Sequence, residues 1–249
     1  MDSSTSTAPA GGSGPLGFGA ALQVISAPRA AFEAVARDPQ WIGPTLISLV
    51  IAVVGAFLML PVGLSMQEEL TIASLEKFDA PDEVVDQALA ELPDPDNPGP
   101  GFYGQQMSGP IIATVFGLLL GALIVMLGAK FAGGGEGYRA NLSLVAVANV
   151  IASLGFLVKA AVTAMTGTYE VSLGLPALLG LEFHSLPAIF LDLLDPFFLW
   201  HLFVLGIGVS VVNRISKGAG NGVAFVWWAL SLLPVLGMRF YFAWILGPA

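Results

Sequence analysis

The sequence predicts an all-α, polytopic membrane protein with five transmembrane helices and its N-terminus inside. Of its 249 residues, 55% are hydrophobic and only 11% are charged, whereas a soluble domain has about 25% charged residues. Such a chain cannot cover a water-facing surface. Apolar runs long enough to cross a hydrocarbon core, which takes about 20 residues, lie at roughly 41–64, 109–129, 144–165, 196–212 and 223–246.

Basic residues predict the orientation of these spans. Arg29 and Arg37 precede span one. Lys130 and Arg139 lie between spans two and three, and Arg214 and Lys217 lie between spans four and five. All of them fall on one side of the membrane if the N-terminus is inside. The positive-inside rule places that side in the cytoplasm, and the C-terminus then lies outside.

The segments outside the spans divide the chain further. Residues 1–14 are poor in bulky apolar side chains and are expected to be disordered. Residues 15–40 are typical of two short cytoplasmic helices, either in the membrane interface or packed on the inner loops. Residues 41–249 form the membrane domain. Its first outer loop, 65–108, is an acidic insertion with ten acidic residues and one lysine, for which we expect a solvated helical hairpin.

The second outer segment, between spans three and four, is too apolar for a free loop and is interrupted by Pro176 and Pro187. We expect a short interfacial or re-entrant helix there. His184 lies two residues from Glu182 in this segment, as a polar tip at the headgroup level or in a proton-linked role.

Charged residues at the outer ends of the spans form the candidate site. Lys159 in span three and Arg239 in span five approach the outer boundary, where Asp192 and Asp195 precede span four. Charges in a span are costly and usually face protein or water. These residues predict an outer-leaflet layer that holds a lipid headgroup, an ion or a partner, or that forms structural salt bridges. Asp195 is also expected to cap span four, with Pro196 as its first helical residue.

Small residues in the spans predict close helix packing. The glycines that carry this prediction are Gly117, Gly121 and Gly128 in span two and Gly206 and Gly208 in span four.

Composition argues against most chemical functions. The chain has no cysteine, two histidines and a net charge of −9, so thiolate chemistry and a basic nucleic-acid surface are absent. No metalloprotease, nucleophile-elbow or phosphate-loop motif occurs. We therefore expect no enzymatic activity, no metal, no cofactor and no nucleic-acid partner, but contact with the lipid bilayer and with a membrane-protein partner or a second copy.

Several stretches resemble bacterial members of the YIP (Ypt/Rab-interacting protein) membrane family. They are "VISAPRAAFEAVARDPQW", "GGGEGYRANLSLVAVA", "LLDPFFLWHLFVLGIGVSVVNRISKGAG" and "GVAFVWWALSLLPVLG". The motif residues are Gly137, Tyr138, Arg139, Phe197, Trp200, Ser216 and Lys217. The aspartate–leucine–tyrosine–glycine–proline motif of eukaryotic relatives is missing, and with it the support for a Rab-type partner.

The resemblance implies a non-enzymatic helical protein of the bacterial cytoplasmic (inner) membrane. Some bacterial relatives accompany ABC-type exporters, so the resemblance implies a scaffold or accessory role. The alternative is a small transporter or channel that uses the charged outer layer.

Overall fold

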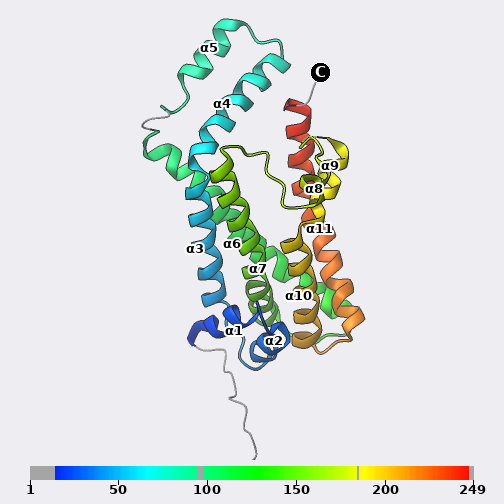
Figure 1. Cartoon of the computed structure of the whole chain (residues 1–249). Coiled ribbons are helices and arrows are strands. Elements are labelled where there is room, and N and C mark those ends of the chain that lie inside the picture. The colour runs from blue at the N-terminus through cyan, green and yellow to red at the C-terminus, as the bar shows by residue number, and fades with distance from the viewer. Residues whose placement is uncertain (1–14, 95–97, 184, 247–249) are drawn as a thin grey trace, which may run out of the picture.

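The computed structural model describes residues 15–94, 98–183 and 185–246. The tail 1–14, expected to be disordered, and His184 lie outside these residues. Within them the regular secondary structure is entirely helical, which confirms the all-α prediction. The helices form an elongated bundle (Figure 1).

Four long helices are each apolar enough to cross a membrane. They are α6 (Gly99–Phe131), α7 (Tyr138–Thr166), α10 (Pro196–Asn213) and α11 (Lys217–Leu246). They contain the second to fifth predicted spans, although α6 begins well before residue 109. The multi-pass membrane architecture is therefore confirmed.

The first predicted span is not one straight helix. It consists of α3 (Ile42–Leu58) and the start of α4 (Leu60–Lys77), whose axes differ by 64°. Pro61 lies in the first turn of α4 and has no N–H to continue the hydrogen bonds of α3, so the chain bends there. α3 and the start of α4 are long and apolar enough to cross a membrane only if the two helices together form one broken span.

The acidic insertion is largely helical. It includes most of α4, the whole of α5 (Asp82–Ala90) and the first turns of α6. Asp82 and Glu83 lie in the first turn of α5, where negative charge favours the positive end of the helix dipole. In Figure 1, α5 and the end of α4 project beyond the bundle.

Two short helices close the opposite end of the bundle, here called the α1/α2 end. They are α1 (Phe18–Gln23) and α2 (Pro28–Arg37), which follow a 3-10 turn at Pro15–Gly17. Phe32 of α2 is fully buried, whereas Leu22 of α1 is 64% exposed. Two settings were predicted for residues 15–40: packing on the inner loops or lying in the membrane interface. α2 packs on the bundle, whereas α1 leaves apolar side chains uncovered.

The loops that carry the basic residues lie at the same α1/α2 end. The α6–α7 and α10–α11 connections both reach it (Figure 1). Arg139 donates to the Pro39 carbonyl oxygen at 3.3 Å, and Arg214 lies 3.9 Å from Glu136. These cations therefore lie at one end of the bundle, and the side of the membrane on which that end lies stays a prediction.

The other end, here called the α9 end, is built by the segment between α7 and α10. This segment contains α8 (Leu175–Leu179), α9 (Leu186–Leu191) and the 3-10 turn η2 (Asp192–Leu194). These short helices lie beside the end of α11 (Figure 1). The segment is helical, as predicted, but it forms two short helices and a 3-10 turn rather than one helix.

The core is centred on α7 and α10, and α1, α2, one face of α6 and the start of α11 pack on them. Residues 140–148 of α7 are all buried. Of the most apolar part of each helix, 44% is buried in α7 and 50% in α10, against 22% in α6 and 17% in α11. About half of the most apolar part of α7 and α10 is thus covered by protein, while α6 and α11 leave most of theirs to the membrane.

Candidate binding site

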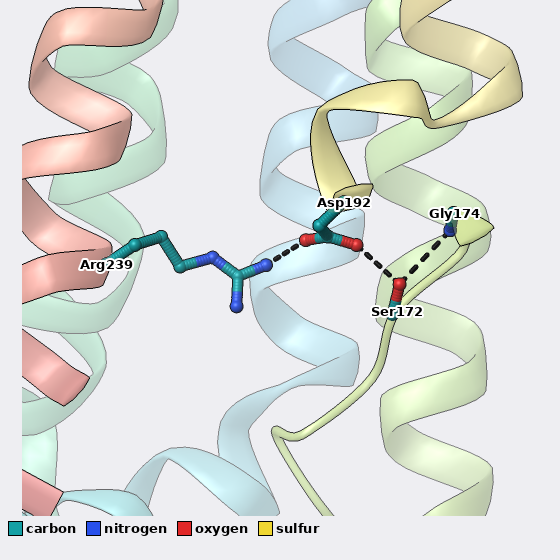
Figure 2. Close-up of polar contacts among 4 residues, drawn as sticks. All are labelled: Ser172, Gly174, Asp192 and Arg239. Carbon is teal, nitrogen blue, oxygen red and sulfur yellow. Dashed lines mark hydrogen bonds and ion pairs between the residues drawn. The ribbon is translucent and has the colours of Figure 1, made fainter. Parts of the chain in front are cut away.

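An ion pair joins α11 to the short helices of the α9 end. Arg239 of α11 donates to one carboxylate oxygen of Asp192, which begins η2 (Figure 2). The other oxygen of Asp192 accepts from the Ser172 hydroxyl, which itself accepts from the Gly174 N–H at 3.2 Å. Both charged side chains are only 16% exposed. This chain of contacts fixes the α7–α8 loop against α11.

Asp195 caps α10, as the sequence predicts. Its Oδ1 accepts from the N–H groups of Phe197 at 2.7 Å and Phe198 at 3.1 Å. Pro196 is the first helical residue, where its missing N–H leaves nothing unsatisfied. Asp195 therefore stabilises the helix start, and its Oδ1 is already engaged.

Lys159 lies in a cavity with the other three predicted site residues. The cavity measures about 280 Å³, and its lining includes Lys159, Asp192, Asp195 and Arg239. In the described part of the chain no carboxylate oxygen lies within 4.0 Å of the Lys159 ammonium, although Asp192 and Asp195 attract it from further away. The structure brings the four residues together; the ligand of this layer stays a prediction.

A second cavity adjoins the first and is largely apolar. It measures about 440 Å³ and shares Lys159, Val235 and Arg239 with the first cavity. The rest of its lining is Met59, Met66, Tyr169, Phe183, Pro234, Met238 and Phe242. The Arg239 guanidinium lies over the Phe183 ring at 4.3 Å, a cation–π contact that holds it at the cavity wall.

Tyr169 links the rim of this cavity to the acidic insertion. It follows the end of α7 and is hydrogen-bonded to Glu69 of α4. Burial raises the pKa of Tyr169 above its usual range, and the hydrogen bond and negative charge of Glu69 raise it further. The phenol therefore stays neutral at any physiological pH and acts as a hydrogen-bonding contact between α4 and the α7–α8 loop.

Four of the five predicted packing glycines allow close approach. A methyl group on Gly121 would lie 2.7 Å from the Trp227 ring nitrogen, and one on Gly128 would lie 2.9 Å from Val223. In α10, a methyl group on Gly208 would lie 2.8 Å from the Phe32 ring, and one on Gly206 would lie against the Asn221 side chain. Gly117 is different: a methyl group there would meet nothing within 4 Å. Gly117 therefore makes no close helix contact within the described part of the chain, because that side of α6 points out of the bundle.

The motif residues of the α6–α7 loop organise the α1/α2 end. Gly137 precedes α7 in an extended conformation. The Tyr138 hydroxyl donates to the Leu119 carbonyl oxygen of α6 at 2.9 Å, and Arg139 donates to the Pro39 carbonyl oxygen just before α3. These contacts are structural, and none of them involves the cavities.

The remaining motif residues lie along α10 and at the start of α11. Phe197 packs against Gly155, whose missing side chain leaves space for its Cβ. Trp200 packs on the buried core. The Ser216 hydroxyl accepts from the Ala219 N–H at 3.2 Å ahead of α11, and Lys217 is exposed.

A buried amide pair joins α7 to α10 at the α1/α2 end, and only Asn213 of this pair was expected from the sequence to join helices. Asn141 of α7 and Asn213 of α10 exchange side-chain hydrogen bonds of 3.3 and 2.9 Å. Asn141 precedes the predicted start of span three at 144, so the sequence did not place it inside the membrane. Ser172, which positions Asp192, gave no signal in the sequence.

His201 is a second buried polar group of α10. It is 2% exposed, and neither ring nitrogen has a hydrogen-bond partner in the described chain. The Trp227 ring meets it edge-on at 5.1 Å. No group of three or more His, Asp or Glu residues in the described ranges is placed to hold a metal ion.

The fold and the site define a multi-pass α-helical membrane protein with a charged cavity at one end of its bundle. The Yip1 domain family matches residues 22–238, and the chain belongs to that family. A relative is membrane protein YknW of Bacillus subtilis (strain 168), 28% identical over 211 residues, which cover 79% of this chain and 80% of that protein. No solved structure matches significantly. The family resemblance in the sequence is confirmed.

Proposed function

We propose that this protein is a non-enzymatic scaffold or accessory protein of a bacterial cytoplasmic membrane, with its N-terminus in the cytoplasm. It acts through helix–helix contacts with a second membrane protein, either a subunit of an ABC-type exporter or another copy of itself. The observation that carries this proposal is the uneven burial of the long helices. The core helices are packed, whereas α6 and α11 leave long apolar faces uncovered.

The uncovered faces are large and continuous along each helix. On α6, Ile112 and Phe116 are 64% and 63% exposed; on α11, Phe225 and Leu233 are 56% and 65% exposed. Gly117 lies beside Phe116 and would let a partner helix approach closely. In the membrane such faces contact either lipid or another helix, so they are the surfaces on which a scaffold would assemble.

Photo-crosslinking in native membranes tests this proposal. A photoreactive amino acid at Phe116 or Leu233 is expected to give discrete protein adducts, whose mass distinguishes a second copy from an exporter subunit. Val50 of α3, which is as exposed at 62% but lies outside the two proposed faces, is the matched control for adducts that exposure to the bilayer alone would give. Lipid adducts alone at all three positions would contradict the scaffold role.

Single-cysteine labelling tests the proposed orientation, because the natural chain contains no cysteine. Glu83→Cys on α5 is expected to react with a membrane-impermeant maleimide in intact cells. Gly135→Cys in the α6–α7 loop should react only after the membrane is permeabilised. The reverse pattern would invert the proposed topology.

The alternative function, a small transporter or channel, is favoured by the cavities at the α9 end. In this proposal Lys159, Arg239, Asp192 and Asp195 receive the solute. The packed α1/α2 end argues against a through-path, because Phe32 lies against Gly208 there. Flux into liposomes that contain purified protein decides between the two: ion or small-solute flux above that of empty liposomes supports transport.

A further inference from the structure

We propose that the α9 end binds one phospholipid, with its phosphate beside Lys159 and an acyl chain in the cavity between α4 and α11. This inference does not depend on the scaffold role, because no protein partner takes part in it. The ligand of the charged layer is inferred from the chemistry of the side chains that line the two adjoining cavities.

The hydrogen-bonding partners in the charged cavity single out Lys159. Asp192 already accepts from Arg239 and from Ser172. Asp195 uses Oδ1 for the cap of α10. Lys159 alone among the four has its charged group without a direct partner in the described chain. Lys159 is half-buried within its span, where a charged group is costly unless an acceptor approaches it, so this position favours an anionic oxygen.

The adjoining cavity supplies the apolar part of the site. Its walls are mainly methionine and aromatic side chains, with Lys159 and Arg239 at one edge. It continues into a third cavity of about 810 Å³ that shares Met59, Met66 and Met238 with it. Methionine side chains are flexible and adapt to irregular apolar ligands. Inorganic phosphate would leave this apolar space without an occupant, whereas a phospholipid matches both parts.

The depth of Lys159 suits a lipid headgroup. It lies seven residues before the end of α7 at Thr166, or about 10 Å along a helix that rises about 1.5 Å per residue. Met238, on the cavity wall, is 55% exposed. The cavity is therefore open to the side of the bundle, from which a membrane lipid can enter.

Thermal stability with defined ligands tests the site. Short-chain phosphatidylglycerol, added in detergent to the delipidated full-length protein, is expected to raise the melting temperature by about 5–10 °C at a hundredfold excess over the Kd. Diacylglycerol with the same chains lacks the phosphate, and inorganic phosphate lacks the chains. Neither should reproduce the shift.

The substitution Lys159→Gln removes the charge but keeps a similar length. It is expected to abolish the stabilisation by phosphatidylglycerol. Lys130→Gln, on an exposed residue at the α1/α2 end, is the matched control and should keep the full shift. An equal shift in both variants, or an equal shift with diacylglycerol, would overturn the proposal.

A second variant tests the apolar cavity while keeping Lys159. Met238→Trp adds volume at the wall shared by the two larger cavities. It is expected to prevent the stabilisation by phosphatidylglycerol and to reduce the phospholipid that co-purifies, as measured by native mass spectrometry. Undiminished stabilisation and retention of phospholipid would overturn the proposed acyl-chain position, even if Lys159→Gln fails to fold.

Discussion

The two ends of the bundle are held together by different means. At the α1/α2 end, Phe32 is fully buried against Gly208, and Asn141 and Asn213 exchange buried hydrogen bonds. At the α9 end, short helices are tied to α11 by Arg239 and leave two cavities beside Lys159. The α1/α2 end is therefore closed by side chains that fit together, whereas at the α9 end an ion pair joins the helices and cavities remain between them.

The difference shows how one small bundle can combine stability with binding. Close packing gives its stabilisation only when the space is filled, so it leaves no room for a ligand. A few charged contacts can hold helices apart and keep a cavity between them. Substitutions at the two ends should therefore have different consequences, and the following experiments compare them.

The largest expected effect is at the packed end. Phe32→Ala removes a fully buried ring, and such substitutions cost about 3–5 kcal/mol because the cavity cannot collapse. Unfolding in denaturing detergent measures the loss. Leu22→Ala on α1, where the side chain is 64% exposed, should cost far less. Equal losses would show that α2 is not part of the core.

The next effect is at the charged end. Asp192→Asn leaves Arg239 without its carboxylate. Breaking a fully buried pair costs about 3–5 kcal/mol, and this pair is 16% exposed, so we expect about 2 kcal/mol. The matched control is Glu136→Gln at the other end. Its pair with Arg214 is 3.9 Å long and largely exposed, so its loss should be close to zero.

A double-mutant cycle of Asp192→Asn with Arg239→Gln sharpens this comparison. The two losses should be strongly non-additive, because the contact joins both side chains. Strict additivity in thermal melts would remove the ion pair from the account of the α9 end.

A smaller effect is expected for the buried amide pair. Asn141→Ala leaves the Asn213 amide with one partner fewer, although Asn213 still donates to the Val209 carbonyl oxygen at 3.2 Å. Hydrogen bonds between membrane helices contribute about 0.6 kcal/mol on average, so we expect a loss of about 1 kcal/mol. The same unfolding measurement checks it. A loss above that of Asp192→Asn would reverse the expected ranking of these two polar contacts.

Sequence patterns predicted the helical fold because apolar runs of membrane length have few alternatives. They predicted the cap at Asp195 and Pro196 because its signals are local. They did not predict the bend before Pro61, since a proline near a helix end is compatible with either a continuous or a broken span. They also did not predict that Gly117 faces outward, because spacing alone does not show which face of a helix is covered.

The charged layer was partly predictable. The depth of Lys159 and Arg239 along their spans placed them near Asp192 and Asp195. The pairing within the layer was not predictable, because it depends on the path of the α7–α8 loop, where Ser172 positions Asp192. An asparagine within a span is typical of contacts between helices, and Asn213 makes such a contact with Asn141, whereas the Asn149 amide donates to Ser153 within α7 at 3.3 Å.

The contrast between a closed end and an open, ligand-binding end is tested most directly with two matched cysteine variants of this cysteine-free chain. Val235→Cys lines both cavities at the α9 end, and Val209→Cys lies at the packed end, where the valine is 0% exposed. We predict that N-ethylmaleimide labels Val235→Cys rapidly in the folded protein and that short-chain phosphatidylglycerol slows this reaction. Val209→Cys should react only after unfolding. Equal labelling rates at the two positions, or no protection by the phospholipid, would contradict the account.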